Sequence, residues 1–368
     1  MERLSLKGHT IRVIDYPINW QKEKYRSLIS KRTVYEGVSR FYPGSKVTVV
    51  RPAIVKLPLL DKLSIPFTHR KEISRQIDEF KPDVVVGLGI LNNYFAIREA
   101  KKAGIPFIYY LIDTLHRLID NGVYQFIAKE FEKNNIKNST HVLAINKKLM
   151  EYALEMGGDR DHASVIPAGI DLEFFKSPAK LDRYKYGLEK DDFVLFFMGW
   201  LYAFTGVLEI AEALVKNNYD RVKLLVVGEG DVYPSLVNIA KTSDKIIVIG
   251  KVPYSEIPSL LSMADVCILP AYNIEVMQDI VPIKIYEYLA SGKPVLSTEL
   301  PGIKEEFGID GGIIFVKDNY DLIKHANYLM NDKIYKKYSS KAVNSIKSND
   351  WSNITSIFED LLINNTIK

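Results

Sequence analysis

Short apolar runs alternate with amphipathic segments along most of this chain. The runs at 193–198, 223–227 and 266–269 are almost continuously apolar, and helical periodicity follows the first two. Uninterrupted apolar runs of this length are typical of strands buried on both faces, as in a parallel sheet covered by helices. The pattern therefore predicts an α/β fold.

The alternation occurs in two blocks, which are separated by a polar, proline-containing stretch at 176–180. A chain of 368 residues is long for a single hydrophobic core, so two domains are expected. We predict two doubly wound domains, at 1–175 and 176–348. In open α/β sheets ligands bind beyond the carboxyl ends of the strands, which favours a site in a cleft between the domains.

One stretch of the second block, 279–297, combines an acid, a lysine and a second acid: Asp279, Lys284 and Glu287. Pro282 suits a helix start, and residues 284–290 have helical spacing. Asp279 would then lie in a loop facing a helix N-terminus, and the set would suit a ligand with hydroxyls and phosphates. The alternative is an ordinary strand–helix junction with surface charges.

The composition, 47% hydrophobic and 26% charged, is that of a globular protein. No apolar run reaches the about 18 residues of a membrane span, and residues 1–9 lack the apolar region of a signal peptide. The single cysteine, Cys267, lies in an apolar run, so it predicts a buried thiol and no internal disulfide. These features favour the cytoplasm.

The charge is distributed unevenly along the chain. Lys and Arg number 28 against 20 Asp and Glu up to Lys176, and 21 against 25 beyond it. A basic first half suits a membrane face, a phosphorylated acceptor or nucleic acid. The chain lacks zinc-finger spacing, RNP-like patterns and basic-region heptads, so nucleic acid is not expected. The basic, aromatic stretch 20–40 predicts either a helix at a membrane surface or a solvated basic face.

Motifs in a fixed order give the chain a family resemblance. They lie at 146–157 with 165–175, 195–200, 226–231, and 250–253 with 264–270 and 279–297. In this order they resemble the retaining glycosyltransferase family 4, over roughly residues 80–365. The resemblance implies the GT-B fold, two Rossmann-like domains with a cleft between them, and a last helix at 349–368 that returns to the first domain.

The resemblance also implies roles for the residues of the second domain that bind the donor. The family's pair of acids falls on Asp279 and Glu287, the first reaching the donor sugar and the second the ribose. Lys251-Val252 matches the segment whose backbone reads the base. Gly228, in the motif at 226–231, falls among the donor-binding residues, and Gly169 matches a close backbone approach at the hinge.

In the first domain, Asp113 and His116 follow a predicted strand at 106–112. The family places a histidine near the reacting sugar at this point, which implies catalytic roles for His116, Asp113 and, from the second domain, Asp279. The alternative is a structural histidine.

One departure from the family concerns the phosphates. The usual motif after the first strand of the second domain supplies an arginine and a lysine, but residues 199–206 here place Trp200 and Thr205 at those positions. We expect Lys284 to take over the diphosphate, beside Gly199, with Thr205 as a hydroxyl donor and Trp200 as a stacking wall. The alternative is a degenerate site that binds no nucleotide sugar.

A second departure is at the N-terminus. Residues 4–14 resemble the family's first helix and second strand, which implies that the first strand and its glycine-rich loop are missing. In the other register, residues 10–16 form the first strand. The first register would leave a sheet edge incomplete and would affect acceptor binding.

The expected reaction moves a sugar from a nucleotide-diphosphate sugar to an acceptor hydroxyl with retention of configuration. The acceptor expected is a glycan or lipid-linked glycan, with the protein cytoplasmic or peripheral to the inner face of an anionic membrane. No Asp-x-Asp pair lies in a loop suitable for a metal site, so neither a metal nor another cofactor is expected. The alternatives are a UDP-sugar 2-epimerase of the same fold and a non-catalytic GT-B-like binding protein.

Overall fold

The computed structural model describes residues 1–15, 29–55, 60–119, 121–176, 178–217, 219, 221–278, 280–309 and 311–366. It divides into two compact units, each described by itself below. The first unit comprises Met1–Pro167 with Ser352–Lys368, and the second comprises Ala168–Trp351. The sequence placed the corresponding boundaries at 175/176 and 348/349.

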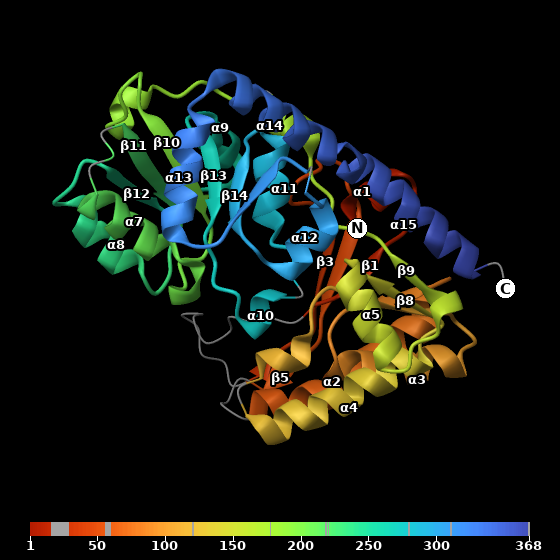
Figure 1. Cartoon of the computed structure of the whole chain (residues 1–368). Helices are drawn as coiled ribbons and strands as arrows, with labels where there is room; N and C mark the ends of the chain where they lie inside the picture. The colour runs from red at the N-terminus through yellow and green to blue at the C-terminus, as the bar shows by residue number, and fades with distance from the viewer. Residues whose placement is uncertain are drawn as a thin grey trace. The chain divides into compact units, whose positions relative to one another are not determined.

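The second unit contains a six-stranded parallel sheet in the order β12-β11-β10-β13-β14-β15. Figure 1 shows several of these strands side by side between helices. Their bounds are β10 Phe193–Met198, β11 Val222–Val227, β12 Ile246–Gly250, β13 Val266–Leu269, β14 Val295–Thr298 and β15 Ile313–Val316. The predicted α/β fold with buried parallel strands is confirmed.

The strand order of this sheet reverses between β10 and β13. The chain runs outward from β10 through β11 to β12, and then returns to β10's other side to build β13, β14 and β15. Leu195 of β10 is paired in register with Val266 of β13. Such a reversal is a switch point, and ligands of open α/β sheets bind beyond the carboxyl ends of the strands at this point.

Helices cover the second sheet, and α7, α8 and α13 pack side by side. Their bounds are α6 Leu172–Lys176, α7 Val207–Lys216, α8 Tyr233–Ala240, α9 Ile257–Ser262, α10 Glu275–Gln278, α11 Ile283–Ala290, α12 Pro301–Phe307, α13 Asn319–Leu329 and α14 Asp332–Ser345. The core side chains of β10 and β13, among them Phe196 and Cys267, are completely buried. The burial predicted for Cys267 is therefore confirmed.

The first unit contains a parallel sheet in the order β6-β7-β8-β9, a second sheet β1-β4-β3, and the pair β2-β5. Their bounds are β1 Arg12–Ile14, β2 Ile29–Ser30, β3 Thr33–Val38, β4 Val47–Arg51, β5 Ile54–Val55, β6 Val85–Gly87, β7 Phe107–Leu111, β8 His141–Ala144 and β9 Ala163–Val165. The helix considered for 20–40 is wrong over its described part, because residues 29–30 and 33–38 are strands. Residues 20–28 lie outside the described residues.

The helices of the first unit include one that the sequence pattern did not predict, α4, Gly122–Asn138. The others are α1 Glu2–Leu6, α2 Leu60–Phe80, α3 Leu91–Lys102 and α5 Lys147–Glu155. In the first turns of α4 the side chains of Val123, Tyr124 and Phe126 are exposed. Apolar residues on exposed positions obscure the helical period, which explains why α4 was missed.

The C-terminal helix α15, Trp351–Thr366, packs on the first unit. Ile354 is buried in a cluster with Ile108 and Leu143 of β7 and β8. Lys7 and His9 pair with Glu359 of the same helix. The unit therefore joins the two ends of the chain. Among the described residues, no helix has the length and apolar character of a transmembrane segment.

Candidate functional site

In the second unit, the loops after β10, β11 and β13 meet at the carboxyl ends of the strands. The Gly199 N–H donates to the Val227 carbonyl at 2.9 Å, and the Tyr272 N–H donates to the Phe204 carbonyl at 2.9 Å. These bonds connect the loop after β10 with the end of β11 on one side and with the loop after β13 on the other. The residues expected to bind a donor thus follow neighbouring strands at one edge of the sheet.

Two glycines make this close packing feasible. Gly228 has φ +145°, and a Cβ there would lie 1.9 Å from the Gly199 carbonyl oxygen. A Cβ at Gly199, which has φ +120°, would lie 2.9 Å from the Lys284 Nζ. Residues with side chains rarely adopt these backbone angles. Both positions therefore require glycine, and the glycine at 199 leaves room for the Lys284 side chain.

Lys284 is the cation of this site. It lies in the first turn of α11, half-buried, with its Nζ 4.3 Å from the centroid of the Phe197 ring. Desolvation lowers the pKa of Lys284 to about 8, against the opposing attraction of Glu287. An ammonium with this pKa is largely charged at pH 7, is poorly hydrated, and is well suited to an anionic ligand.

Glu287 lies one turn further along α11 and is 8% exposed. Burial raises its pKa, while a hydrogen bond from Tyr254 and the charge of Lys284 oppose the rise. Tyr254 begins the short 3-10 helix η6, Tyr254–Glu256, and stacks on Phe174 with ring centroids 5.4 Å apart. Tyr254 was not predicted from the sequence, although its position just after Lys251-Val252 was a signal. Val252 itself is half-buried two residues before it.

The backbone at Gly169 also lies at a close approach, in this case to the side chain of Trp351. A Cβ at Gly169 would lie 2.4 Å from the ring of Trp351, the last residue of the second unit. The Trp351 N–H donates to the Ile170 carbonyl at 2.9 Å. Gly169 is therefore required for packing at the point where the chain enters this unit.

Thr205 and Trp200 stand where the family has its cations. Thr205 is 6% exposed and its Oγ1 donates to the Tyr202 carbonyl at 2.7 Å within the 3-10 helix η5, Ala203–Thr205. Its only hydroxyl proton is thus used inside the loop, which differs from the expected role as a donor to phosphate. Trp200 is 61% exposed and stacks on Tyr202, which stacks on Phe204.

Asp279, the first acid of the expected pair, lies outside the described residues. The described part of this stretch contains the second acid, Glu287, together with Lys284. Within the described residues, no three His, Cys, Asp or Glu side chains lie close enough to hold a metal ion.

In the first unit, His116 lies in a short 3-10 helix after β7, η2, Leu115–Leu118, and is 5% exposed. Its Nδ1 lies 2.8 Å from Glu132 Oε2. Tyr152 of α5 donates to the same Oε2 at 2.5 Å, and Tyr109 of β7 donates to Oε1 at 3.4 Å. Glu132 was not predicted, because α4, which carries it, was not recognised. Tyr152 and Tyr109 lie on elements that the sequence did predict, but their contacts with Glu132 were not foreseen.

Asp113 lies three residues before His116 and is half-buried. Its Oδ1 accepts a hydrogen bond from the Thr114 N–H at 2.8 Å. Burial raises the pKa of Asp113, against this hydrogen bond. Its carboxyl therefore takes up a proton more readily than an exposed aspartate does.

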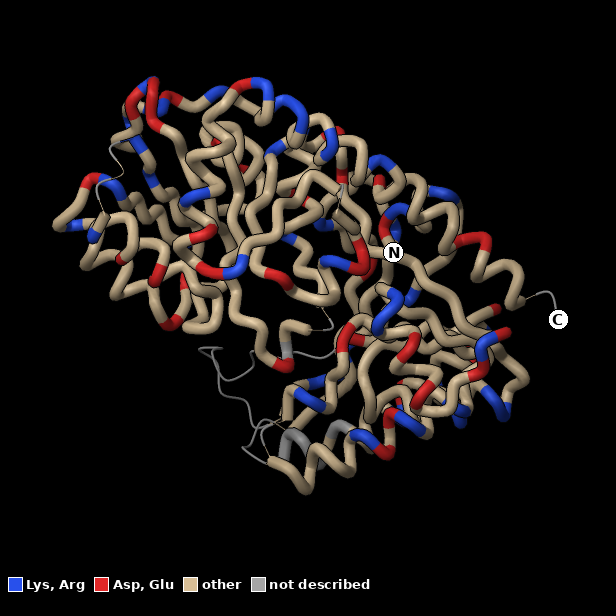
Figure 2. The backbone as a smooth tube through the Cα atoms, in the orientation of Figure 1, with Lys and Arg blue, Asp and Glu red and all other residues tan. Residues whose placement is uncertain are grey.

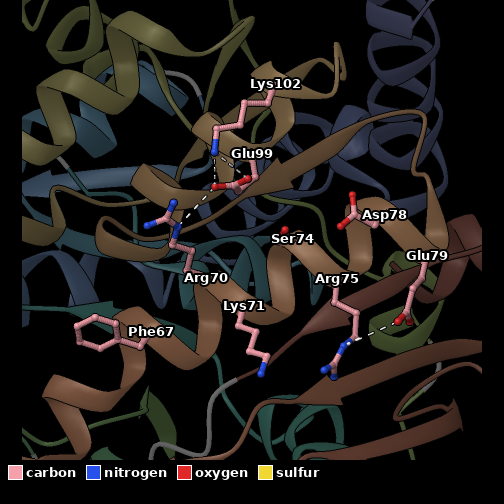
Figure 3. A pocket seen from close by; sticks show the side chains of 9 residues that line it. All are labelled: Phe67, Arg70, Lys71, Ser74, Arg75, Asp78, Glu79, Glu99 and Lys102. Carbon is pink, nitrogen blue, oxygen red and sulfur yellow. Dashed lines mark hydrogen bonds and ion pairs between the residues drawn. The ribbon is translucent and has the colours of Figure 1, made fainter.

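A hollow of about 550 Å³ lies elsewhere in the first unit, between α2 and α3 (Figure 3). Its walls carry charges of both signs that pair with one another. Glu99 accepts from Lys102 at 2.9 Å and lies 3.5 Å from Arg70, and Arg75 lies 3.8 Å from Glu79. Figure 2 likewise shows acidic and basic residues interspersed along these helices. No residue of the predicted site is among the described residues that line the hollow.

Comparisons with known families cover nearly the whole chain. The model of the family described as "Glycosyltransferase Family 4" matches residues 1–174. The model described as "Glycosyl transferases group 1" matches residues 179–347. A comparison with curated protein sequences gives no match.

Several solved structures are similar in fold. Sucrose-phosphate synthase from Thermosynechococcus elongatus has a TM-score of 0.74 at 14% identity, over 99% of this chain and 90% of that one. Anabaena HepE in complex with UDP has a TM-score of 0.67 at 16% identity, over 87% and 86%. A glycosyltransferase from Rickettsia africae has a TM-score of 0.65 at 19% identity, over 85% and 83%. The HepE protein has also been solved with UDP-glucose. With these folds and both family matches, the chain belongs to the group 1 glycosyltransferases and has the GT-B fold.

Proposed function

We propose that this protein transfers a sugar from a nucleotide-diphosphate sugar to an acceptor hydroxyl with retention of configuration. The observation that carries the proposal is the placement of Lys284 and Glu287 on α11, with the Lys284 Nζ beside Gly199 of the loop after β10. A lysine for phosphate and a carboxylate for hydroxyls at a switch point form a site for a nucleotide.

In this proposal, Lys284 replaces the usual pair of cations at the diphosphate. Its ammonium faces Gly199, and its low hydration increases the electrostatic stabilisation of a leaving diphosphate, where negative charge develops during transfer. Trp200, which is exposed in the same loop, supplies an aromatic surface for stacking. Thr205 contributes through the shape of its loop, since its hydroxyl proton is already donated to Tyr202.

Glu287 accepts hydrogen bonds from the ribose hydroxyls, and the backbone around Val252 contacts the base. Tyr254 supports this arrangement because its hydroxyl donates to Glu287 and its ring is fixed on Phe174. Hydrogen bonds to a charged acceptor are each worth about 1.5–3 kcal/mol, enough to fix the orientation of the nucleotide.

His116, Asp113 and Asp279 act on the transferred sugar. The basic first half of the chain supports an acceptor with negative charge, such as a lipid-linked glycan, with the protein at a membrane surface. Lys284 provides positive charge that a metal would otherwise provide, so the reaction is proposed to need no metal or other cofactor.

A binding experiment tests the donor site. Thermal unfolding is followed with UDP, GDP, ADP and UDP-glucose, the last because a neighbour in fold was solved with it. Ligand at about 100 times its Kd should add about 2.7 kcal/mol of stability. Glu287→Gln should weaken the response. Glu189→Gln should leave the response unchanged, because Glu189 is exposed and precedes β10, at the opposite end from the carboxyl ends of the strands. A protein that responds to none of the four contradicts a nucleotide-sugar site.

A second experiment separates the reaction from its alternatives. The nucleotide sugar that binds is incubated with glycan and lipid-linked acceptors, and the products are analysed for a new glycosidic bond and its anomeric configuration. An inverted product contradicts retention. A change at C2 of the sugar without transfer indicates an epimerase, and binding without any chemistry indicates a non-catalytic protein.

A further inference from the structure

In the first unit, a completely buried carboxylate lies against the histidine proposed to act on the sugar. Glu132 is 0% exposed and His116 is 5% exposed. Oε2 of Glu132 lies 2.8 Å from His116 Nδ1, and it also accepts from Tyr152 at 2.5 Å. Oε1 accepts from Tyr109 at 3.4 Å. The four side chains come from η2, α4, α5 and β7.

Both phenols beside this carboxylate donate to it, which is the arrangement that an ionised carboxylate requires. Burial, and then the contact with Glu132, raise the pKa of Tyr109 and of Tyr152 well above the usual value, so both phenols stay protonated. An ionised carboxylate has only acceptor atoms. Two phenols and a ring nitrogen that donate to it compensate for the removal of its charge from water.

The same contacts determine where His116 carries its proton. Nδ1 lies near two oxygen atoms, Glu132 Oε2 at 2.8 Å and the Tyr152 hydroxyl at 3.2 Å. The single proton of that hydroxyl is directed to Glu132, at 2.5 Å. A deprotonated Nδ1 would therefore face only lone pairs. Nδ1 must carry the proton, which in the neutral ring leaves Nε2 with a lone pair.

We propose that Glu132 is a positioning residue, which holds the His116 ring with Nδ1 protonated and so keeps Nε2 as the atom that exchanges hydrogen bonds with a hydroxyl of the transferred sugar. The proposal rests on the proposed function for the role of His116. It goes beyond that function in two ways. It assigns the His116 proton to Nδ1, and it names Glu132 of another helix as the residue that keeps the proton there. Carboxylates that orient a functional imidazole in this way are known to determine its tautomer and basicity.

The charged and titratable groups around the ring come from every element packed against it. They are Glu132 from α4, Tyr152 from α5, Tyr109 from β7, and Arg117, which follows His116 in η2 and whose charge opposes the rise in the pKa of Tyr152. Glu132 is the acid of this set. Its replacement by glutamine keeps the shape and an acceptor oxygen but removes the charge.

The tautomer can be measured without a substrate. The protein is labelled with 15N in its histidine rings, and the His116 signals are identified by their loss in His116→Gln. The neutral ring of the wild-type protein should carry its proton on Nδ1. Glu132→Gln should shift part of the population to the Nε2-protonated tautomer, because a glutamine amide can also donate to Nδ1. A wild-type ring protonated only at Nε2, or spectra that Glu132→Gln leaves unchanged, would overturn the proposal.

Kinetics with UDP-glucose and an acceptor then test the link to function. Glu132→Gln should reduce kcat by about 10- to 100-fold, leave the Kd for UDP unchanged and shift the acidic limb of the pH profile, and Glu132→Asp should recover part of the rate. Tyr109→Phe, which removes only the longest bond of the network, is the matched control and should stay within about twofold. Melting curves verify that each variant is folded.

The outcomes distinguish the role of His116 from the positioning role of Glu132. If His116→Ala transfers sugar at the wild-type rate, the proposed role of His116 fails, whatever the tautomer. If His116→Ala is inactive while Glu132→Gln keeps the wild-type rate and pH profile, the role of His116 stands and the positioning role of Glu132 is wrong. A loss of rate in Glu132→Gln that Tyr109→Phe reproduces in full would indicate a purely structural network.

Discussion

The two units hold their candidate groups in opposite ways. In the second unit, Lys284 and Glu287 lie three residues apart on one helix, which begins at the carboxyl edge of a parallel sheet. In the first unit, His116 is enclosed by side chains from three other elements, and its closest partner, Glu132, is completely buried. Lys284 and Glu287 are neighbours along the chain, whereas His116 and Glu132 lie on different elements.

This difference corresponds to two kinds of chemistry. A charged group that must meet a nucleotide needs access, and partial desolvation increases its attraction for phosphate. A group that exchanges a proton or a hydrogen bond with one sugar hydroxyl needs a fixed orientation, which a buried network provides. The second unit is accordingly expected to determine affinity for the donor, and the first to determine the rate. Four predictions test this division.

The largest effect is expected at His116. His116→Ala should reduce kcat for transfer by about 10²–10⁴-fold, the usual contribution of a positioned acid or base, because the sugar loses its hydrogen-bond partner. The Kd for UDP, measured by calorimetry, should not change. His162→Ala is the control, because its ring is half-exposed and pairs with Asp159. A change in UDP affinity similar to the loss of rate would contradict the division between the units.

The next effect concerns stability in the second unit. Gly228→Ala places a Cβ 1.9 Å from the Gly199 carbonyl oxygen at φ +145°. Backbone strain and overpacking should lower the free energy of unfolding by about 2–4 kcal/mol and displace the loop beside Lys284. Urea denaturation measures the loss. Gly122→Ala, where nothing lies within 4 Å of the new Cβ, should change it by less than about 0.5 kcal/mol. Equal effects would show that the close approach is absent.

A smaller effect is expected from pH at Lys284. Its ammonium, with a pKa of about 8, is charged below that pH and neutral above it. The affinity for UDP-glucose should therefore be constant near pH 7 and fall as pH rises above 8, by up to about tenfold per pH unit. Calorimetry between pH 6.5 and 9 measures the slope. Lys284→Gln should bind more weakly at pH 7 and lose the slope. A wild-type affinity that is flat with pH would exclude Lys284 as the phosphate cation.

The smallest effect is expected at Trp200. Trp200→Arg restores a cation at the family's usual position, and since the side chain is 61% exposed no cavity results. UDP should bind about two- to fivefold more tightly, as expected for an exposed charge pair of about 0.5–1 kcal/mol, and the gain should decrease in high salt. Trp200→Leu, which adds no charge, is the control. A weaker binding of UDP to Trp200→Arg than to Trp200→Leu would show that the indole itself contributes to the site.

The sequence by itself determined the fold class and much of the second unit. The strands at 193–198 and 266–269 have the predicted bounds, because buried parallel strands leave a local, continuous apolar signal. The helix with Lys284 and Glu287 was predicted for the same reason, since both residues lie within one turn of a single periodic segment. The family motifs added the order of the elements.

The tertiary structure alone decided which side chains meet. Glu132 contacts His116 across sixteen residues of sequence, from a helix whose exposed apolar turns concealed its period. The bond from Tyr254 to Glu287, and the use of the Thr205 hydroxyl within its own loop, depend likewise on how segments fold against one another. Periodicity records which face of an element is buried. It contains no record of which distant side chain lies opposite, because that depends on the packing of all the elements together.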